Sequence, residues 1–335
     1  MTTIVGFELE DWEYNYLSAK LKGNNFISIP GHLSQQNLSL AAEAEILTVF
    51  IYSKIGKKEL DKMPKLKMIA TRSTGFDHID LGECKARKIA VCNVPEYGSQ
   101  TVAEHTIALI LAISKKLLPS IERTRKGDFS LDGLRCFDLE GKTLGIIGFG
   151  RIGQRTAKMA KAFGMNILAY SPNIDSDIAT KLECIPASLD QLLASSDIIS
   201  LHAPLNKDTY HMINESTIQK MKDGVIIINT ARGALIDSKA LVRALDSGKV
   251  SAAGLDVLEE ECNIKEEAQL LSPQFAGECD LKTVVANHIL LNRPNVIVTP
   301  HNAFNSKEAL QRILDTTAEN ILSFLNGRPQ NVVYS

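Results

Sequence analysis

Three polar residues in the C-terminal half of the chain carry the side chains needed to hold an acid and to move a proton: Arg232, Glu261 and His301. Each follows an apolar run of strand length, so each is expected at the carboxyl end of a β-strand. An arginine can bind a carboxylate through two parallel hydrogen bonds, and a histidine can donate a proton near neutral pH. A carboxylate beside the histidine would favour its protonated form. Taken singly, such residues are more often solvated or inert, so their context decides.

That context is a glycine-rich turn at Gly148, Gly150 and Gly153, whose spacing is typical of a dinucleotide-binding fingerprint. An apolar run at 143–147 predicts a strand before the turn, and helical spacing over 152–163 predicts a helix after it. The first glycine allows the tight turn, the second lets a pyrophosphate approach the backbone, and the third lets the helix pack on the strand. An ordinary strand-to-helix turn is the alternative. The predicted strand and helix on either side of the turn favour a cofactor site. A cofactor site combined with the three polar residues indicates a site for hydride transfer.

The composition is that of a soluble globular protein of about two domains, with 335 residues, 44% hydrophobic and 23% charged. A formal net charge of -2 without a basic run argues against nucleic acid or an anionic membrane as a partner. The start of the chain lacks the basic region of a signal peptide, and the longest apolar stretch, near 106–114, is too short to span a bilayer. The six cysteines have no zinc spacing, so no metal site is expected. They indicate the reduced packing residues of a cytoplasmic protein.

The N-terminal part alternates short apolar runs with helical or polar segments, which predicts βαβ units around a parallel sheet. The predicted strands are 3–7, 26–30, 48–53, 68–73 and 88–93. A long helix is expected over 99–118, with Ser99 as its N-cap. Its apolar stripe is wide enough to cover more than one element, including a partner subunit.

A second α/β unit is expected to begin near Lys142. After the fingerprint strand, further strands are predicted at 165–170, 197–201, 224–229, 251–257 and 295–299. The region 259–290 is expected to be a long charged loop with a helix near its end, and 306–325 an amphipathic helix that packs on the first unit.

The expected fold class is therefore α/β, with two doubly wound parallel-sheet domains of Rossmann or flavodoxin type and an interdomain cleft. The expected substrate domain comprises 1–99 plus 302–335, and the expected dinucleotide-binding domain comprises 100–301.

Four motifs resemble the signatures of the D-isomer-specific 2-hydroxyacid dehydrogenases. They are residues 148–153 (GFGRIG), 229–237 (NTARGALID), 254–261 (GLDVLEEE) and 299–301 (TPH). Within that family, the long interval between Glu261 and His301 and the segment 293–304 (RPNVIVTPHNAF) look most like the D-lactate dehydrogenase branch. Asn302 and Asn305 depart from the commoner residues of that branch.

The resemblance implies stereospecific reduction of a small 2-oxo acid, pyruvate to D-lactate, with NADH. Arg232 would hold the carboxylate, His301 would protonate the ketone oxygen, and Glu261 would orient His301 and raise its pKa. The backbone N–H groups of Thr74 and Gly75 would complete the carboxylate site. The resemblance assigns the wall of the R-group pocket to Tyr52, Tyr97 and Phe304. Core packing is the alternative for these three aromatic residues.

The resemblance also implies a set of cofactor contacts. The amides of Arg151 and Ile152 would face the pyrophosphate. Ala203, Pro204 and Thr209 would line the adenosine, Thr230 and Ala231 would lie beneath the nicotinamide, and Asp256 would hold its carboxamide. One position departs from an NAD-specific pattern: Ser171 stands where an acidic residue would bind the ribose 2′-hydroxyl. NAD is the expected cofactor, and NADP use is the alternative.

Three other functions stay open. The chain could reduce another 2-oxo acid, such as glyoxylate, hydroxypyruvate or a bulkier one, or it could be an NAD-sensing corepressor module. A formate or phosphite dehydrogenase is less favoured, because the aromatic residues suggest a pocket for a carbon side chain. The resemblance further implies a homodimer formed through the cofactor domain.

Overall fold

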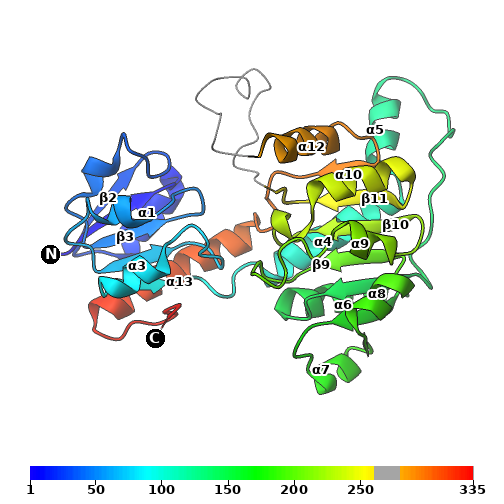
Figure 1. Ribbon diagram of the computed structural model, residues 1–335. Helices are drawn as coiled ribbons and strands as arrows, with labels where there is room; N and C mark the ends of the chain where they lie inside the picture. Colours follow the sequence, from blue (N-terminus) through cyan, green and yellow to red (C-terminus); the bar gives the residue numbers. More distant parts are fainter. Residues whose placement is uncertain (260–279, 335) are drawn as a thin grey trace. The chain divides into compact units, whose positions relative to one another are not determined.

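A computed structural model describes residues 1–259 and 280–334 of the chain. The chain divides into two compact units, which we call unit 1 (Met1–Tyr97 with Asn305–Ser335) and unit 2 (Gly98–Phe304). Each unit has its own parallel sheet with helices on both faces (Figure 1). The expected α/β fold with two doubly wound sheets is therefore confirmed. The cleft between the two domains and the assignment of a role to each domain stay predictions.

Unit 1 has a five-stranded sheet in the order β2-β1-β3-β4-β5, and all neighbours are parallel. This is the flavodoxin-like order. The strands are β1 (Thr3–Phe7), β2 (Asn25–Ile29), β3 (Ile46–Val49), β4 (Met68–Thr71) and β5 (Ala90–Cys92). The helices are α1 (Asp11–Lys20), α2 (Lys57–Leu60), α3 (Leu81–Ala86) and α13 (Lys307–Leu325), with a 3-10 turn at Leu38–Ala41. Leu17 of α1 and Leu314 of α13 cover one face, and Leu60 and Cys84 lie in the core of the other.

Unit 2 has a seven-stranded parallel sheet in the order β12-β11-β10-β9-β6-β7-β8. Its strands are β6 (Thr143–Ile147), β7 (Asn166–Tyr170), β8 (Ile185–Pro186), β9 (Ile198–Leu201), β10 (Val225–Asn229), β11 (Val250–Leu255) and β12 (Val296–Val298). The strand order reverses between β6 and β9, so the dinucleotide-binding crevice of a Rossmann fold is expected at the carboxyl ends of these two strands.

The helices of unit 2 cover both faces of this sheet. They are α4 (Ser99–Ser114), α5 (Leu117–Arg125), α6 (Arg151–Ala162), α7 (Ser176–Lys181), α8 (Leu189–Ser195), α9 (Glu215–Gln219), α10 (Ser238–Ser247) and α12 (Leu281–Leu291), with a 3-10 turn at Gly233–Leu235. Apolar residues of α4, α6 and α7 fill one core, and those of α8, α9, α10 and α12 fill the other. Burial on both faces explains why the strands are continuous apolar runs.

The expected helix 99–118 is two helices. The first ends at Ser114, Lys116 has a left-handed φ of 48°, and α5 begins at Leu117. Pro119 explains the break, because proline has no N–H for the carbonyl four residues earlier and its ring clashes with it. The predicted N-cap is also wrong: Ser99 is the first helical residue, and Gly98 is the N-cap.

Among the other predicted elements, most strand limits agree with the structure to within two residues, and two elements need comment. The strand expected over 48–53 ends at Val49, because the chain turns away over 50–53. In the expected loop of 259–290, the helix near the end is α12, and most of the loop lies outside the described residues.

Candidate functional site

The turn between β6 and α6 requires glycine at two of the three fingerprint positions. Gly148 has a φ of 97°, and a Cβ there would lie 2.5 Å from the nitrogen of Ala203. A Cβ on Gly153 would lie 2.2 Å from the carbonyl oxygen of Gly148, so only glycine lets α6 pack at this point. A Cβ on Gly150 would meet nothing within 4 Å. The space beside the Gly150 backbone is therefore open, as a bound pyrophosphate requires.

The N-terminus of α6 differs from most helix starts in unit 2. Five other helices there are capped by a side chain that accepts a backbone hydrogen bond: Asp175, Ser188, Asn214, Asp237 and Asp280. Helix α6 begins after Gly150, which has no side chain to act as a cap. The first N–H groups of a helix have no intrahelical acceptor, and the helix dipole favours an anion beside them. The residues present thus fit the phosphates of a dinucleotide.

The residues expected around the adenosine follow β7 and β9, the two strands next to β6. Ser171 comes directly after β7 and is half-buried, whereas Ala203 is buried and Pro204 is exposed. The hydroxyl of Thr209 donates to the carbonyl of Pro204 at 2.6 Å and accepts from the Asn206 N–H at 2.8 Å. This hydroxyl therefore closes the turn over 204–209. The cofactor contacts of these residues stay predictions.

Arg232 lies in a loop after β10 that its neighbours hold in place. The Asn229 side chain donates to the carbonyl of Arg232 at 2.9 Å and accepts from the N–H of Ala231 at 3.0 Å. A guanidinium N–H of Arg232 donates to the carbonyl of Ala231 at 2.8 Å. The hydroxyl of Thr230 lies 2.9 Å from that of Thr106 on α4. The half-buried arginine is thus held at the carboxyl end of its strand.

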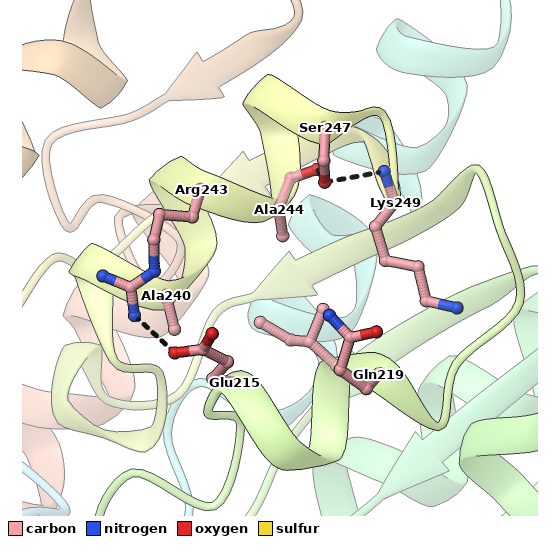
Figure 2. A pocket seen from close by; sticks show the side chains of 8 residues that line it. Glu215, Gln219, Ala240, Arg243, Ala244, Ser247 and Lys249 are labelled. Atoms are coloured by element: carbon pink, nitrogen blue, oxygen red, sulfur yellow. Dashed lines mark hydrogen bonds and ion pairs between the residues drawn. The ribbon is translucent and has the colours of Figure 1, made fainter.

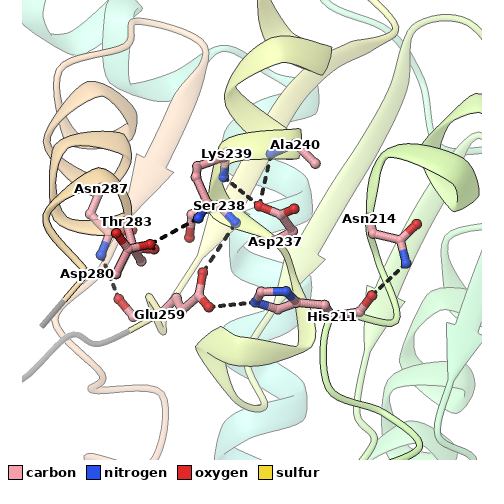
Figure 3. Close-up of polar contacts among 10 residues, drawn as sticks. All are labelled: His211, Asn214, Asp237, Ser238, Lys239, Ala240, Glu259, Asp280, Thr283 and Asn287. Atoms are coloured by element: carbon pink, nitrogen blue, oxygen red, sulfur yellow. Dashed lines mark hydrogen bonds and ion pairs between the residues drawn. The ribbon is translucent and has the colours of Figure 1, made fainter.

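A polar pair that the sequence did not single out, a half-buried histidine and a buried carboxylate, lies beside this loop. Glu259 follows β11, and one of its carboxylate oxygens lies 2.5 Å from Nε2 of His211 (Figure 3). The N–H of Ser238 donates to the other oxygen at 3.4 Å, and the Asn287 side chain donates to the Glu259 carbonyl at 2.6 Å. A Cβ on Gly233 would lie 2.3 Å from the nitrogen of Glu259, so the residue after Arg232 packs directly on this segment.

His211 belongs to the same cluster through its backbone, because its N–H donates to the carbonyl of Ala234 at 2.9 Å. Its ring also stacks on Tyr210, with 4.0 Å between the ring centroids. The sequence contained one signal for Glu259, its place directly after an apolar strand, which Glu261 shares.

A second buried carboxylate holds the loop that carries His301. The Asp256 side chain, 1% exposed, accepts hydrogen bonds from the hydroxyl of Thr299 at 2.5 Å, the N–H of Asn302 at 3.0 Å and the N–H of Ala303 at 2.9 Å. His301 has a left-handed φ of 51°, and its N–H donates to the Asp256 carbonyl at 2.9 Å. A non-glycine residue rarely adopts such a conformation unless its surroundings impose it. Asp256 is therefore the anchor of the His301 loop.

His105 of α4 extends this network. Its Nε2 lies 3.0 Å from the Thr299 hydroxyl and 3.5 Å from the Asp256 carboxylate. This network fixes both the strand end and the loop after β12, because each group is held by the next.

Two of the three predicted catalytic residues thus lie at the carboxyl ends of nearby strands. Strand β10 pairs with β11, and β11 pairs with β12, so the loops of Arg232, Asp256 and His301 follow three successive strands. Glu261 lies outside the described residues. Phe304 is half-buried, and a Cβ on Gly98 would lie 3.7 Å from the Cβ of Phe304.

The substrate residues expected in unit 1 follow β3, β4 and β5. Tyr52 is 59% exposed in the turn after β3. Thr74 and Gly75 follow β4: the hydroxyl of Thr74 donates to the Val94 carbonyl at 2.9 Å, and the hydroxyl of Ser73 donates to the Gly75 carbonyl at 2.6 Å. These contacts hold the 73–75 turn at the carboxyl edge of the sheet. Tyr97, at the end of this unit's first segment, is half-buried, and its carbonyl accepts from Arg312 at 2.8 Å.

Burial determines the charge of one histidine beside the β9 strand end and of three cysteines elsewhere in the two units. It lowers the pKa of His202 to about 3, so this imidazole is neutral at physiological pH. Nδ1 of His202 is buried without a hydrogen-bond partner, and its Nε2 lies 2.9 Å from the Ser200 hydroxyl. Burial also raises the pKa of the Cys84, Cys92 and Cys184 thiols to about 11. These thiols are protonated and free, as the sequence predicts for packing cysteines.

A hollow of about 180 Å³ lies elsewhere, between α9 and α10 (Figure 2). Arg243 and Glu215 form an ion pair of 3.0 Å on its wall, and Lys249, which precedes β11, lines its other side. Lys249 marks the amino end of the strand, opposite the end where ligands bind in such sheets. We therefore assign the hollow no part in the site.

Within residues 1–259 and 280–334, no group of three or more histidine, cysteine or acidic side chains could hold a metal ion. In the same ranges, no helix combines the length and the hydropathy needed to cross a membrane.

Comparison with known proteins identifies the family. Residues 107–303 match the model of the D-isomer specific 2-hydroxyacid dehydrogenase, NAD binding domain. A D-lactate dehydrogenase of Escherichia coli is 36% identical over 297 residues, which cover 88% of each chain. A glyoxylate reductase of Thermococcus litoralis is 36% identical over 304 residues, 88% of this chain and 85% of that protein. The crystal structure of D-lactate dehydrogenase from Aquifex aeolicus, complexed with NAD and lactic acid, has a TM-score of 0.86 at 40% identity and covers 97% of this chain and 96% of that one.

The chain therefore belongs to the D-isomer-specific 2-hydroxyacid dehydrogenase family. It is an oxidoreductase with an NAD-binding domain, a D-2-hydroxyacid dehydrogenase that acts on small 2-hydroxy or 2-oxo acids. The relatives named for lactate and for glyoxylate are equally similar to it, at 36% identity. Sequence similarity alone thus leaves the particular 2-oxo acid open.

Proposed function

We propose that this protein is an NAD-dependent D-lactate dehydrogenase, which reduces pyruvate to D-lactate with NADH. The main support is the succession of strand ends in unit 2, with Arg232 after β10, Asp256 after β11 and His301 after β12, in the sheet that carries the open turn at Gly150. The similarity to the Aquifex aeolicus enzyme, crystallised with NAD and lactic acid, is consistent with lactate as the product.

In this proposal, Arg232 binds the substrate carboxylate through two N–H groups and polarises the adjacent ketone. Protonated His301 donates its proton to the ketone oxygen. Glu261 pairs with His301 and favours the protonated imidazole. The nicotinamide supplies a hydride when it is bound. The carbonyl carbon gains that hydride, its oxygen gains the proton, and a D-2-hydroxy acid results.

The proposed cofactor-binding site lies at the carboxyl ends of β6, β7, β9, β10 and β11. The pyrophosphate would lie at the amides of Arg151 and Ile152, where α6 begins without a side-chain cap. We propose Ala203, Pro204 and Thr209 for the adenosine and Thr230 and Ala231 for the nicotinamide. Asp256 would hold the carboxamide. A carboxylate has about four acceptor positions, and three of those on Asp256 are used within the protein, so one can accept a carboxamide N–H.

Ser171 is the residue that bears on the choice between NAD and NADP. It stands at the end of β7, where a carboxylate would repel a 2′-phosphate. The position lacks that negative charge, so we propose NAD as the main cofactor with weakened discrimination against NADP. Steady-state kinetics with NADH and NADPH tests this, and an NADH preference of more than about a hundredfold would show that another residue discriminates.

For the substrate, we propose that the amides of Thr74 and Gly75 bind the carboxylate together with Arg232, and that Tyr52, Tyr97 and Phe304 face the R-group. A steady-state panel of pyruvate, glyoxylate, hydroxypyruvate and a bulkier 2-oxo acid, with stereochemical analysis of the product, tests the assignment. Pyruvate must give the highest or nearly the highest kcat/KM, and the product must be the D-isomer. A clear preference for glyoxylate or hydroxypyruvate would move the protein to another branch of the family.

Two variants test the catalytic roles. His301→Ala should lower kcat far more than NADH affinity, because the proton moves only in the chemical step. Arg232→Lys should raise KM for the 2-oxo acid and also lower kcat, because lysine cannot bind the carboxylate through two parallel bonds. If Arg232→Lys changed only thermal stability, the carboxylate would have to bind elsewhere. Tight NADH binding without turnover of any 2-oxo acid would favour the corepressor function instead.

We further propose a cytoplasmic homodimer that forms through unit 2. Leu117, Leu118 and Ile121 of α5 and the following Phe129 and Leu131 are large apolar side chains that are exposed in one protomer. Exposed apolar groups so close in sequence favour a protein partner, and a second copy is the partner proposed here. Light scattering during gel filtration should give twice the mass of the chain. The double variant Ile121→Asp, Leu131→Asp places two negative charges on this surface and should then give the mass of the monomer.

A further inference from the structure

The turn that carries Tyr52 is held by a single carboxylate from another strand. Glu8 follows β1, and one of its carboxylate oxygens accepts from the Tyr52 N–H at 2.8 Å. The other oxygen accepts from the Phe50 N–H at 2.9 Å and from the Ser53 hydroxyl at 2.6 Å. Ser53 is buried, and its hydroxyl oxygen also accepts from the N–H of Leu33 at 2.9 Å. Three hydrogen bonds to one carboxylate thus determine the path of the chain over 50–53.

Glu8 is itself fixed at the same edge of the sheet. It has a left-handed φ of 57°, and its N–H donates to the carbonyl of Gly31 at 2.9 Å. The guanidinium of Arg72, which is fully buried, donates to the carbonyls of Glu8 at 2.5 Å and Phe7 at 2.8 Å and to the Thr48 hydroxyl at 3.3 Å. The Arg72 side chain, after β4, therefore holds the backbone at the end of β1, and the Glu8 side chain holds the turn after β3.

This arrangement places an aromatic ring where core packing does not require one. The Tyr52 side chain is 59% exposed, so the three bonds to Glu8 do not serve to bury it. Ligands of parallel α/β sheets bind beyond the carboxyl ends of the strands, which is the edge where Tyr52, Thr74 and Gly75 lie. A ring held at this edge by its own backbone can limit the size of a ligand side chain, because the turn cannot move aside.

We propose that Glu8 is a specificity-determining residue that acts by positioning Tyr52. The Glu8 carboxylate holds the 50–53 turn so that the Tyr52 ring restricts the R-group of the 2-oxo acid to a small one. This inference rests on the proposed dehydrogenase function and adds to it the residue that sets the substrate size. Since Glu8 contacts the turn and not the substrate in this account, its loss should change selectivity more than it changes the chemical step.

The test compares kcat/KM for pyruvate with kcat/KM for 2-oxoisocaproate in the full-length protein. Glu8→Ala removes all three acceptor bonds, and Glu8→Gln replaces one acceptor oxygen by an NH2 group that opposes the protein's own donors. Both variants should reduce the preference for pyruvate about tenfold, the size expected when a pocket no longer discriminates an added alkyl group. The dissociation constant for NADH, measured by fluorescence, should stay within about twofold of the wild-type value.

Glu45→Gln is the matched control. Glu45 also accepts a backbone N–H in unit 1, from Thr3, but it lies at the amino end of β3. Its selectivity should equal that of the wild type. If Glu8→Ala does not fold, Ser53→Ala carries the test, because it removes one of the three bonds and should shift selectivity in the same direction by a smaller factor.

The outcomes distinguish a failure of the proposed role of Glu8 from a failure of the proposed dehydrogenase function. An unchanged ratio in the Glu8 variants, or a shift that Glu45→Gln shares, would overturn the role of Glu8 and leave the dehydrogenase function standing. A wild-type protein that turns over no 2-oxo acid would overturn both.

Discussion

Replacing His211 with alanine should destabilise unit 2, because it leaves a buried carboxylate without its main partner. The Glu259 side chain is 8% exposed, and its oxygens contact the His211 ring at 2.5 Å and the Ser238 N–H at 3.4 Å. The second contact is long, so the ring supplies most of the compensation for burying this group. Deleting one partner of a buried pair costs about 3–5 kcal/mol. The His211 side chain is 24% exposed, so water can reach the carboxylate, and we expect about 2–3 kcal/mol.

A double-mutant cycle measures this coupling. Glu259→Gln, His211→Ala and the double variant are unfolded in urea, and far-UV circular dichroism follows both units. Trp12, the single tryptophan, lies in α1 of unit 1, so its fluorescence follows that unit alone. The interaction free energy should be about 1.5–3 kcal/mol. The Trp12 fluorescence transition should keep the urea midpoint of the wild type, because unit 1 is not changed.

The control cycle uses the Arg243–Glu215 ion pair on the wall of the hollow in Figure 2. Its two side chains are solvent-exposed, and the distance between nitrogen and oxygen is 3.0 Å. Exposed pairs contribute about 0–1 kcal/mol. The His211 and Glu259 variants should also raise KM for the 2-oxo acid, because Gly233, next to Arg232, packs on the backbone of Glu259. A coupling no larger than that of the control pair, with KM unchanged, would refute the argument that buried charge holds the arginine loop.

Three further predictions concern the cofactor side of unit 2. Gly153→Ala should destabilise the protein by about 1–3 kcal/mol and weaken NADH binding in titrations, because its Cβ would lie 2.2 Å from the Gly148 carbonyl oxygen; wild-type affinity would contradict the packing role. Burial lowers the pKa of His202 from 6.5 in the unfolded chain to about 3 in the folded protein. The folded state therefore keeps the ring neutral while the unfolded state gains a proton below pH 6.5. The stability of the fold is complete above pH 6.5 in this respect and is lost as the pH falls toward 3. The free energy of unfolding should therefore fall by about 1.4 kcal/mol per pH unit below that point, and His202→Gln should lack this component in urea titrations between pH 7 and 5. Ser171→Asp should raise the ratio of kcat/KM for NADH over NADPH about tenfold or more, and an unchanged ratio would place the discrimination at another residue.

The parts of the site that the sequence predicted are those with local causes. Gly148, Gly150 and Gly153 lie within one turn, where the protein backbone excludes a side chain at Gly148 and Gly153, and Gly150 leaves open space for the expected pyrophosphate. The apolar runs of both sheets are equally local, because a strand covered on both faces must be apolar throughout. The break after Ser114 has a local signal too, in Pro119, although the apolar stripe on both sides of it predicts a single helix.

The groups that the sequence could not single out act over long separations. Glu8 contacts the turn over 50–53, and His211 contacts Glu259, so the partners are more than forty residues apart. No periodicity or spacing relates such residues before the strand order is known. Once the order places β1 beside β3, a polar side chain after β1 becomes a natural partner for the loop after β3.

The position of the buried carboxylates supports a role beyond stability. At amino ends of strands, Glu45 and Asp197 each accept a backbone N–H but pair with a lysine and stay partly exposed. At carboxyl ends, Asp256 and Glu259 are buried and hold the loops of His301 and Arg232. Burying a charge is unfavourable even when it is well paired, and an exposed pair would hold a loop with less desolvation. The asymmetry is expected if the carboxyl edge must be rigid before substrate arrives, because preorganised groups lose little freedom when the reaction begins.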